Sequence, residues 1–486
     1  MNLQHPNLLR QQAYLNGQWV SAKSQQTLAV TNPATGETLA HVPNLSAEEA
    51  QQAVHEAHQA QHHWAKLSAQ TRCDHLLNWY NLILKHKDDL AQILSAEQGK
   101  PLKESQSEIE YGANYIRFYA EQAKRIYGET LPAANSDQRI LVIKQPIGVA
   151  AAITPWNFPN AMIARKVAPA LAAGCSFIVR PASQTPLSAL ALAYLSEQAQ
   201  FPKGLFNVLT GESQPLGEVL TQHPLIRKFS FTGSTSVGQK LYAQASKNIT
   251  KVSLELGGNA PFIVFADADL DSAIEGAIAA KYRNSGQTCV CANRFYVHSS
   301  IYDAFIERLT KASEKLRLGN AFTGSPDLGP LIDSKAVEHA NALLKDALTK
   351  GASLTTGGKI DPELGGTYFQ ATVLKDANHN MDLAHEELFA PIAAIYPFDE
   401  EEEVIRYAND TPYGLSAYFY SRDIGRITRV YEQLQYGIVG VNTGLISNPE
   451  APFGGVKQSG IGREGSHHGI EDYLELKYIL LAGINA

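Results

Sequence analysis

The chain has 486 residues, 44% hydrophobic and 18% charged, so it can bury large cores in two to four domains of about 100–200 residues each. Its net charge of −7 argues against a nucleic-acid-binding protein, because nucleic-acid-binding surfaces are basic. The longest apolar run, Val167 to Val179, is shorter than the ~18 residues of a membrane span. The first residues lack the apolar stretch of a signal peptide. We therefore expect no membrane association and a location in the cytoplasm or an organelle matrix.

The predicted elements begin with helices over residues 46–126, where Ser46 and Glu49 have the spacing of a helix capping box. The helical pattern breaks at Gly128. Short apolar strands then alternate with helices, which predicts an α/β fold with a parallel sheet covered on both faces. The strands are expected at 139–145, 148–154, 176–179, 205–209 and 228–231, and the helices at 161–173, at 188–199 and from about 215.

A second α/β run follows Gly257-Gly258 and continues to about residue 441. It opens with an expected strand at 261–265, a helix at 270–283 and a strand at 294–298. The apolar segment 473–484 has the composition of a strand, and such a strand needs a partner sheet.

Two glycine-rich segments resemble nucleotide-binding motifs without fulfilling them. The segment from Gly460 to Gly465 has G-x-G-x-x-G spacing, but no predicted strand precedes it and too few residues follow for a βαβ unit. Gly233 to Gly238 has P-loop glycine spacing, but its lysine is displaced and the Mg²⁺-binding hydroxyl is missing. We read the first as a loop. The second follows a strand and precedes a helix, which suits contact with a phosphate.

The four cysteines, Cys73, Cys175, Cys289 and Cys291, are too few for a disulfide scaffold in so long a chain. The sequence contains neither Cys-x-x-Cys nor His-Glu-x-x-His, so we expect no metal site.

Six short motifs, in order along the chain, resemble those of the aldehyde dehydrogenase superfamily. The motifs are Thr154-Pro-Trp-Asn-Phe-Pro159, Phe231-Thr-Gly-Ser234, Leu254-Glu-Leu-Gly-Gly258, Gly286-Gln-Thr-Cys289, Glu387-Leu-Phe389 and Pro452-Phe-Gly-Gly455. The resemblance implies a Rossmann-like cofactor domain (1–128 and 147–257), an α/β catalytic domain (258–470) and a small β oligomerisation arm (129–146 and 471–486). It also implies a homo-oligomer, either a dimer or a tetramer.

The resemblance implies a catalytic role for three residues. Cys289 would be the nucleophile, adding to an aldehyde to form a thiohemiacetal from which a hydride can leave; the site should then favour its thiolate. Asn157 would donate a hydrogen bond to the oxyanion together with the backbone N–H of Cys289. Glu255 would be the general base that activates water to release the acid from the thioester.

The same resemblance implies an NAD(P)+ site. Glu387 and Phe389 would hold the nicotinamide ribose, with Ala390 where many relatives have glycine. Ser183 stands where NAD-using relatives carry a glutamate that would repel a 2′-phosphate, and Arg180 adds a cation, so we predict a preference for NADP+, with NAD+ possible. The remaining residues expected at this site are Thr154, Pro155, Trp156, Ala182, Gly211, Phe231, Gly233, Ser234 and Leu256.

Within the superfamily the resemblance is strongest to succinate-semialdehyde dehydrogenases of the NADP+-preferring type. Arg165 and Arg283 match arginines that clamp the distal carboxylate of the substrate, and Ser447 matches their hydroxyl partner. Cys291 could form a reversible disulfide with Cys289, because side chains two apart in an extended segment face the same way. A dehydrogenase for another semialdehyde, such as glutarate semialdehyde, and a catalytically silent binding protein stay open as alternatives.

Overall fold

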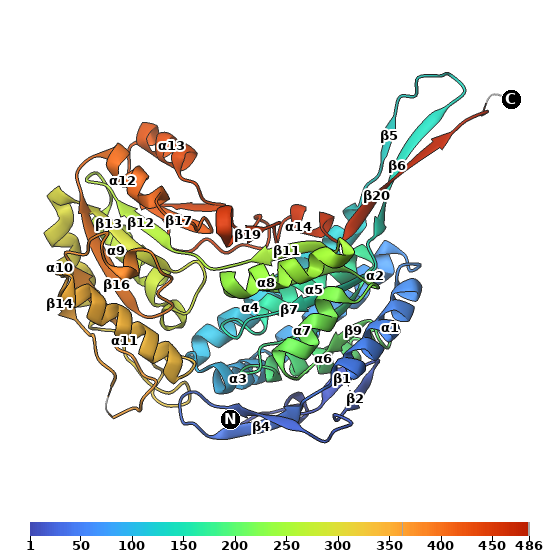
Figure 1. Cartoon of the computed structure of the whole chain (residues 1–486), viewed down its shortest axis with the longest axis horizontal. Helices are drawn as coiled ribbons and strands as arrows, with labels where there is room; N and C mark the ends of the chain where they lie inside the picture. Colours follow the sequence, from blue (N-terminus) through green and yellow to red (C-terminus); the bar gives the residue numbers. More distant parts are fainter. Residues whose placement is uncertain (362, 485–486) are drawn as a thin grey trace.

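The structure, a computed structural model, describes residues 1–361 and 363–484. Two α/β lobes lie side by side, and a three-stranded arm projects from one of them and carries the C-terminal end of the chain (Figure 1). Each lobe is built on one large sheet, and the active-site motifs lie where the two lobes meet. The division into functional units at residues 128, 146, 257 and 470 stays a prediction.

The first lobe contains an eight-stranded sheet in the order β19-β11-β10-β7-β8-β9-β1-β2. Its five central strands are parallel, as the alternating pattern predicted. The edge strands β1, β2 and β19, which were not predicted, pair antiparallel. Strands β7 and β8 are buried throughout, which explains their continuous apolar sequences. The strands are β1 (Ala13–Leu15), β2 (Gln18–Val20), β7 (Val149–Ile153), β8 (Ser176–Arg180), β9 (Phe206–Val208), β10 (Ile226–Thr232), β11 (Lys251–Glu255) and β19 (Gly460–Ile461).

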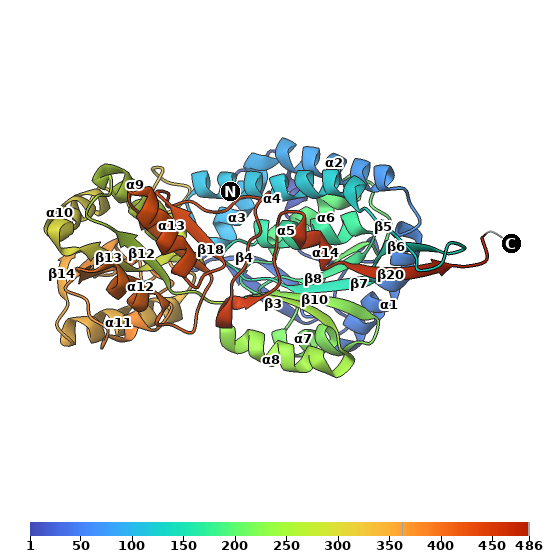
Figure 2. The same cartoon turned by 90° about the horizontal axis from the view of Figure 1, so that it is seen from above.

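Helices cover both faces of this sheet (Figure 2). One face packs against α1 (Ala47–Trp64), α7 (Ser213–Gln222) and α8 (Thr235–Ala245). The other face packs against α2 (Ala69–Lys85), α3 (Lys87–Gln98), α4 (Leu102–Gln122), α5 (Ala161–Ala173) and α6 (Leu187–Gln198). The predicted capping box is confirmed: the Glu49 N–H donates to the Ser46 hydroxyl, and the Ser46 N–H donates to the Glu49 carboxylate.

The second lobe contains a seven-stranded sheet in the order β14-β15-β16-β13-β12-β17-β18, parallel except at β14. Its strands are β12 (Ala260–Val264), β13 (Ala292–His298), β14 (Ser353–Thr356), β15 (Thr372–Lys375), β16 (Ile392–Phe398), β17 (Ser416–Tyr420) and β18 (Ile438–Val441). Its helices are α9 (Leu270–Tyr282), α10 (Tyr302–Ser313), α11 (Ser334–Thr349), α12 (Glu401–Asn409) and α13 (Ile424–Gln433).

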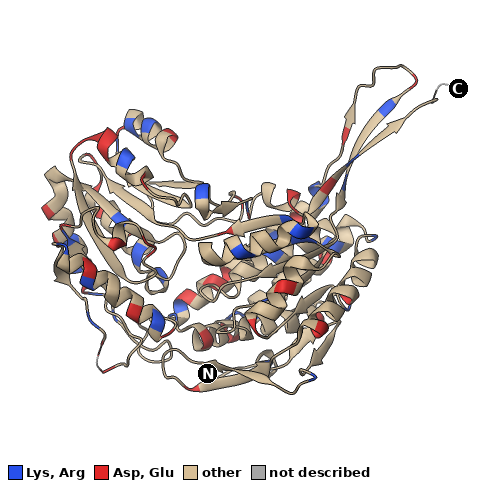
Figure 3. Cartoon of the chain, viewed as in Figure 1, with Lys and Arg blue, Asp and Glu red and all other residues tan. Residues whose placement is uncertain are grey.

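The projecting arm is formed by β5 (Glu129–Leu131), β6 (Arg139–Pro146) and β20 (Leu474–Leu481). The apolar tail therefore finds its partner strand in its own chain, because β20 pairs antiparallel along the whole of β6. The pairing leaves large apolar side chains uncovered: Leu476 is 67% exposed and Tyr478 is 61% exposed. Charged residues of both signs are scattered along the arm, including its outer end (Figure 3).

Several short elements escaped the sequence analysis. They are the hairpin β3 (Thr27–Thr31) and β4 (Thr38–Pro43), the edge strands of the first sheet, and α14 (His468–Glu471). Strand β19 lies inside the glycine-rich segment 460–465 and pairs with the end of β11, placing Gly460 opposite Glu255. No helix within residues 1–361 and 363–484 is long and apolar enough to cross a membrane.

Candidate active site

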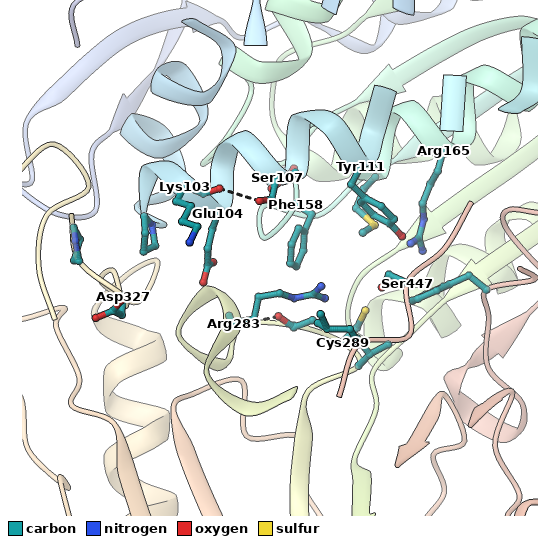
Figure 4. A pocket seen from close by; sticks show the side chains of 18 residues that line it. Lys103, Glu104, Ser107, Tyr111, Phe158, Arg165, Arg283, Cys289, Asp327 and Ser447 are labelled. Carbon is teal, nitrogen blue, oxygen red and sulfur yellow. Dashed lines mark hydrogen bonds between the residues drawn. The ribbon is translucent and has the colours of Figure 1, made fainter. Parts of the chain in front are cut away.

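Two cavities meet at Cys289 at the junction of the lobes. The larger has a volume of about 490 Å³ and is walled by the N-terminal half of α4, by Phe158 and by Arg283 (Figure 4). The smaller, of about 240 Å³, lies on the side of the first sheet and contains Glu255 and Glu387. Because Cys289 lines both cavities, a molecule in either one reaches the same sulfur. The sequence motifs that were spread along the chain converge on this point.

Cys289 lies in a turn at the start of β13, where the Cys291 N–H donates to the Thr288 carbonyl at 3.0 Å. The turn follows Asn284 and Ser285, which both adopt left-handed backbone angles (φ 52° and 54°), a strained conformation that clusters at functional sites. Burial and the nearby Glu255 carboxylate raise the pKa of the Cys289 thiol. The resting site therefore favours the thiol, contrary to our expectation of a thiolate, and a base must take the proton.

Asn157 follows β7 in the loop that carries the first motif. Its Nδ2 donates to the Gln287 carbonyl at 3.1 Å, which holds the amide against the turn of the nucleophile. Its Oδ1 is buried and has no hydrogen-bond partner in the described part of the chain. The amide thus faces the cysteine segment from the opposite lobe, where a neutral donor can act on developing negative charge.

Glu255 ends β11 and is only 4% exposed. Its Oε2 accepts a hydrogen bond from Arg165 Nη2 at 2.5 Å, and its Oε1 is buried without a partner among the described residues. Burial raises the pKa of Glu255 to about 7, against the opposing effect of Arg165. A carboxylate that titrates near neutral pH, beside the nucleophile, is suited to accept a proton.

Arg165 has a more central position than the sequence suggested. It is fully buried on α5, where it forms ion pairs with both Glu255 and Glu464, and its guanidinium lies over the Phe453 ring. Lys166 pairs with the second oxygen of Glu464. Of the three guanidinium nitrogens of Arg165, Nη1 alone has no hydrogen-bond partner within the described ranges, and Arg165 lines the larger cavity. Its predicted role as a substrate clamp stays a prediction, and it would rest on this one nitrogen.

Glu464 is a residue that the sequence analysis missed. It lies in the glycine-rich segment 460–465, which we read as a loop; the structure instead places the two-residue strand β19 at its start and an isolated β-bridge at Glu464. Although burial alone would raise it, the charges of Arg165 and Lys166 lower the pKa of Glu464. This carboxylate therefore stays ionised and stabilises the buried cations that surround the candidate base.

Arg283 and Ser447 line the larger cavity with Cys289. Arg283 is half-buried, lies 5.3 Å from the centre of the Phe158 ring and has no ion-pair partner among residues 1–361 and 363–484. Its charge is therefore available to a ligand. Other lining residues that the sequence analysis did not predict are Glu104, Tyr111, Phe158, Met162 and Phe453.

The smaller cavity fits a nicotinamide. Trp156 and Phe389 meet edge to face at 5.6 Å, and Phe389 has a left-handed backbone (φ 47°). Glu387 accepts a hydrogen bond from the Gly258 N–H at 3.2 Å, and burial raises the pKa of Glu387 to about 7. The predicted residues Pro155, Gly233, Ser234 and Leu256 also line this cavity.

The rest of the predicted cofactor site lies at the carboxyl ends of the parallel strands, where α/β sheets bind nucleotides. Ser234 is the N-cap of α8 and its side chain makes no capping hydrogen bond, so the N-terminus of α8 is suited to bind a phosphate. Gly233 cannot carry a side chain, because a Cβ atom would lie 2.5 Å from the ring of Phe231, which is buried in the core beneath it. These features fit a dinucleotide.

Arg180 is the last residue of β8, and Ser183 lies in the turn that follows. Arg180 Nη2 donates to the Ser183 hydroxyl at 2.6 Å and to the Gly211 carbonyl at 2.9 Å, while Nε has no partner in the described part of the chain. Burial lowers the pKa of Arg180 to about 10, so it stays cationic at neutral pH. Thr154, whose N–H donates to the Arg180 carbonyl, and Ala182 are buried beside this group.

Cys291 lies in different surroundings from Cys289. The segment between them is a turn rather than the extended conformation that we assumed, and Cys291 Sγ donates to the Lys281 carbonyl at 3.3 Å. Both thiols are free in the structure. A disulfide between them stays a prediction, and it would require Cys291 to leave that contact.

Comparison with known proteins agrees with this geometry. The sequence model of the aldehyde dehydrogenase family matches residues 19–479 of this chain. The chain belongs to the aldehyde dehydrogenase family. Three relatives match over 99–100% of this chain and 100% of their own: a 3-sulfolactaldehyde dehydrogenase of Pseudomonas putida (56% identical), a succinate-semialdehyde dehydrogenase [NADP(+)] of Escherichia coli (55%) and a glutarate-semialdehyde dehydrogenase of Pseudomonas aeruginosa (54%).

The fold of this chain also matches solved structures of the family. The crystal structure of a succinate-semialdehyde dehydrogenase from Burkholderia pseudomallei covers 99% of this chain and 100% of its own, with a TM-score of 0.98 at 54% identity. The protein is therefore an aldehyde dehydrogenase in fold and in reaction class, and the predicted α/β class is confirmed.

Proposed function

We propose that this aldehyde dehydrogenase oxidises succinate semialdehyde to succinate with NADP+ as the preferred cofactor. The observation that carries the proposal is the unpaired Arg283 in the cavity of Cys289, with Ser447 and the free Nη1 of Arg165 in the same wall. A substrate whose aldehyde contacts Cys289 and whose other end carries a carboxylate matches this arrangement of charges.

Each candidate catalytic residue has a chemical task. Glu255 accepts the proton of the Cys289 thiol, and the sulfur adds to the carbonyl carbon to give a thiohemiacetal. Asn157 Nδ2 and the Cys289 N–H donate hydrogen bonds to the oxygen that becomes negative. Trp156, Glu387 and Phe389 would hold the nicotinamide of NAD(P)+, which would supply the hydride acceptor when bound. Once the thiohemiacetal carbon has lost its hydride, Cys289 carries the acyl group as a thioester. Glu255, having passed on the first proton, accepts one from water as that water attacks the thioester, and the acid leaves while Cys289 regains its thiol.

A second candidate substrate class follows from the size of the cavity. One extra methylene in a substrate is worth only about 1–3 kcal/mol in discrimination, and the cavity of about 490 Å³ has room for it. The relatives are named for succinate, glutarate and 3-sulfolactate aldehydes, which all carry an anionic group away from the aldehyde. Oxidation of glutarate semialdehyde is therefore the alternative, and a sulfonate would suit the same arginines.

The proposed preference for NADP+ rests on Arg180 and Ser183. Ser183 brings no negative charge to the turn after β8, and Arg180 is held there by two hydrogen bonds with its Nε free. A guanidinium binds phosphate in a fork geometry, so this pair suits a 2′-phosphate. The relative from Escherichia coli that is named for NADP(+) supports the same preference.

We also propose that the enzyme is a cytoplasmic homo-oligomer assembled through the arm. The exposed Leu476 and Tyr478 on β20 would be covered by another subunit. Light scattering tests the assembly, and a purely monomeric protein at micromolar concentration would contradict it.

The activity is tested by initial rates of NADPH or NADH formation with succinate semialdehyde, glutarate semialdehyde and propanal. The proposal predicts the highest kcat/KM for succinate semialdehyde with NADP+ and a much lower value for propanal. Equal kcat/KM values for propanal and succinate semialdehyde would show that Arg283 and Arg165 do not bind the carboxylate of the substrate. No turnover by freshly reduced protein with any aldehyde would favour the silent binding protein.

A further inference from the structure

Lys100 and Glu108 form a buried ion pair outside the residues assigned above. Lys100 Nζ lies 2.6 Å from Glu108 Oε2, and the two side chains are 0% and 1% exposed. Lys100 immediately precedes α4, and Glu108 lies in its second turn. Burial lowers the pKa of Lys100, against the opposing effect of Glu108. A buried pair of this kind is seldom a source of stability, because well-packed apolar residues often serve as well.

Both members of the pair hold the loop that carries Asn157. Lys100 Nζ donates to the Asn157 carbonyl at 2.7 Å. Glu108 Oε1 accepts hydrogen bonds from the Asn160 N–H at 2.9 Å and the Ala161 N–H at 3.2 Å, at the start of α5. The loop is therefore held at Asn157 by Lys100, two residues before α4, and at Asn160 by Glu108 on α4 itself.

The same carbonyl is also bonded to the loop of the nucleophile. Asn284 Nδ2 donates to the Asn157 carbonyl at 3.0 Å, and the Asn284 N–H donates to Glu104 Oε2 at 2.8 Å. Glu104 lies one turn before Glu108 on α4 and faces the larger cavity (Figure 4). One helix of the first lobe thus contacts both the Asn157 loop and the strained segment that leads to Cys289.

We propose that Lys100 and Glu108 are positioning residues that set the distance of the Asn157 amide from the reacting carbon on Cys289. This inference rests on the proposed role of Asn157 as oxyanion donor. Such donors must lie about 2.7–3.1 Å from the oxyanion, and an error of about 1 Å can cost about 100-fold in rate. Loss of Lys100 removes one of the two hydrogen bonds to the Asn157 carbonyl. The bond between Asn284 and Glu104, which holds the segment before Cys289, is kept.

The experiment compares Lys100→Met, the charge-neutral double variant Lys100→Met/Glu108→Gln, and the control Lys87→Met, which breaks the exposed Lys87–Glu110 pair at the other side of α4. Three quantities are measured on each: kcat and KM with succinate semialdehyde, the rate of Cys289 alkylation by iodoacetamide, and the thermal midpoint. Alkylation needs the thiol but no oxyanion donor, so it reports whether the nucleophile loop is intact.

The proposal predicts that Lys100→Met lowers kcat by about 100-fold, while KM and the alkylation rate change by less than about threefold. The double variant has no unpaired buried charge, so it regains stability; it still lacks the bond to the Asn157 carbonyl, so its kcat stays low. Lys87→Met keeps normal kinetics. A purely structural pair would instead give a double variant with restored kcat, and that result would overturn the inference.

Asn157→Ala separates this inference from the proposed function. If Asn157→Ala loses kcat by about 100-fold or more and the folded Lys100 variants do not, the positioning role is wrong and the donor role stands. If Asn157→Ala keeps full kcat, the donor role fails and the positioning role fails with it.

Discussion

Arg165 Nη2 lies 2.5 Å from Glu255 Oε2, so the candidate general base is ion-paired with an arginine that also lines the substrate cavity. The pair links two functions that the sequence suggested separately: proton transfer at Glu255 and anion recognition at Arg165. The pKa of Glu255 depends on two opposing effects: burial raises it, and the positive charge of Arg165 lowers it.

The pH dependence of turnover should report Glu255. Glu255 accepts protons only when ionised, and its pKa is raised to about 7, so kcat should fall as pH drops through about 7 and level off above about pH 8. The measurement is kcat at saturating substrates from pH 5.5 to 9. Glu255→Gln should lower kcat by about 10²–10⁴-fold, and its kcat should no longer change as pH passes through about 7. A fall in kcat near pH 4.5 instead of pH 7 would show that burial does not raise the pKa of Glu255.

Removal of Arg165 should raise the pH at which kcat falls, because that pH reports the pKa of Glu255. Because Arg165 lowers the pKa of Glu255, Arg165→Met leaves a carboxylate that ionises less readily. Propanal is the substrate to use, since it carries no carboxylate and isolates the effect on the base. Unfolding should also become easier by about 3–5 kcal/mol, because Glu464 loses a buried partner. Arg283→Leu is the control and should leave the pH at which kcat falls unchanged.

Arg283→Leu should weaken the binding of anionic substrates selectively. A charge-assisted hydrogen bond contributes about 1.5–3 kcal/mol, so KM for succinate semialdehyde should rise about 10–100-fold. KM for propanal should change by less than about threefold. Equal increases for both aldehydes would mean that Arg283 supports the cavity without binding the carboxylate.

Ser183→Glu should reverse the cofactor preference. A carboxylate next to the 2′-phosphate repels it and also competes for Arg180, so kcat/KM with NADP+ should fall by about 10–100-fold while the value with NAD+ is kept. Ser183→Ala is the matched control, because it removes the hydroxyl without adding charge. Unchanged NADP+ kinetics in Ser183→Glu would place the 2′-phosphate elsewhere.

Cys291→Ala tests the redox switch. If Cys291 forms a reversible disulfide with Cys289, wild-type enzyme inactivated by peroxide should recover with dithiothreitol, and the variant should be inactivated irreversibly. The bond of Cys291 Sγ to the Lys281 carbonyl must break first, so inactivation should be slow. Identical recovery of variant and wild type would exclude the switch.

Much of the architecture could be predicted from local patterns. Helix α5 has the predicted bounds, and the parallel strands around it differ from prediction by one or two residues, because buried α/β elements have continuous apolar sequences between clear breaks. Asn157, Glu255 and Cys289 could be predicted because each lies in a recognisable motif, and the structure brings all three to one cavity.

The surroundings of these residues could not be predicted in this way. Arg165 and Glu464 are 299 residues apart, and no local pattern records a contact over such a separation. The burial that raises the pKa of the Cys289 thiol is likewise a property of the closed lobes and not of the motif. The edge strands β1, β2 and β19 have three, three and two residues, which is too few to show a period.

The antiparallel pairing of β19 with β11 places the segment that follows β19 beside α5, where Glu464 pairs with Arg165. Among the residues of the ion-pair network and the two cavities, Glu464 is the last that the ribosome adds. The turn of Cys289 is built from residues that precede Glu464 in the sequence, whereas the charges of Arg165 and Lys166 are balanced by this later segment and by Glu255. Loss of this one carboxylate would therefore leave two buried cations, Arg165 and Lys166, without the negative charge that they share.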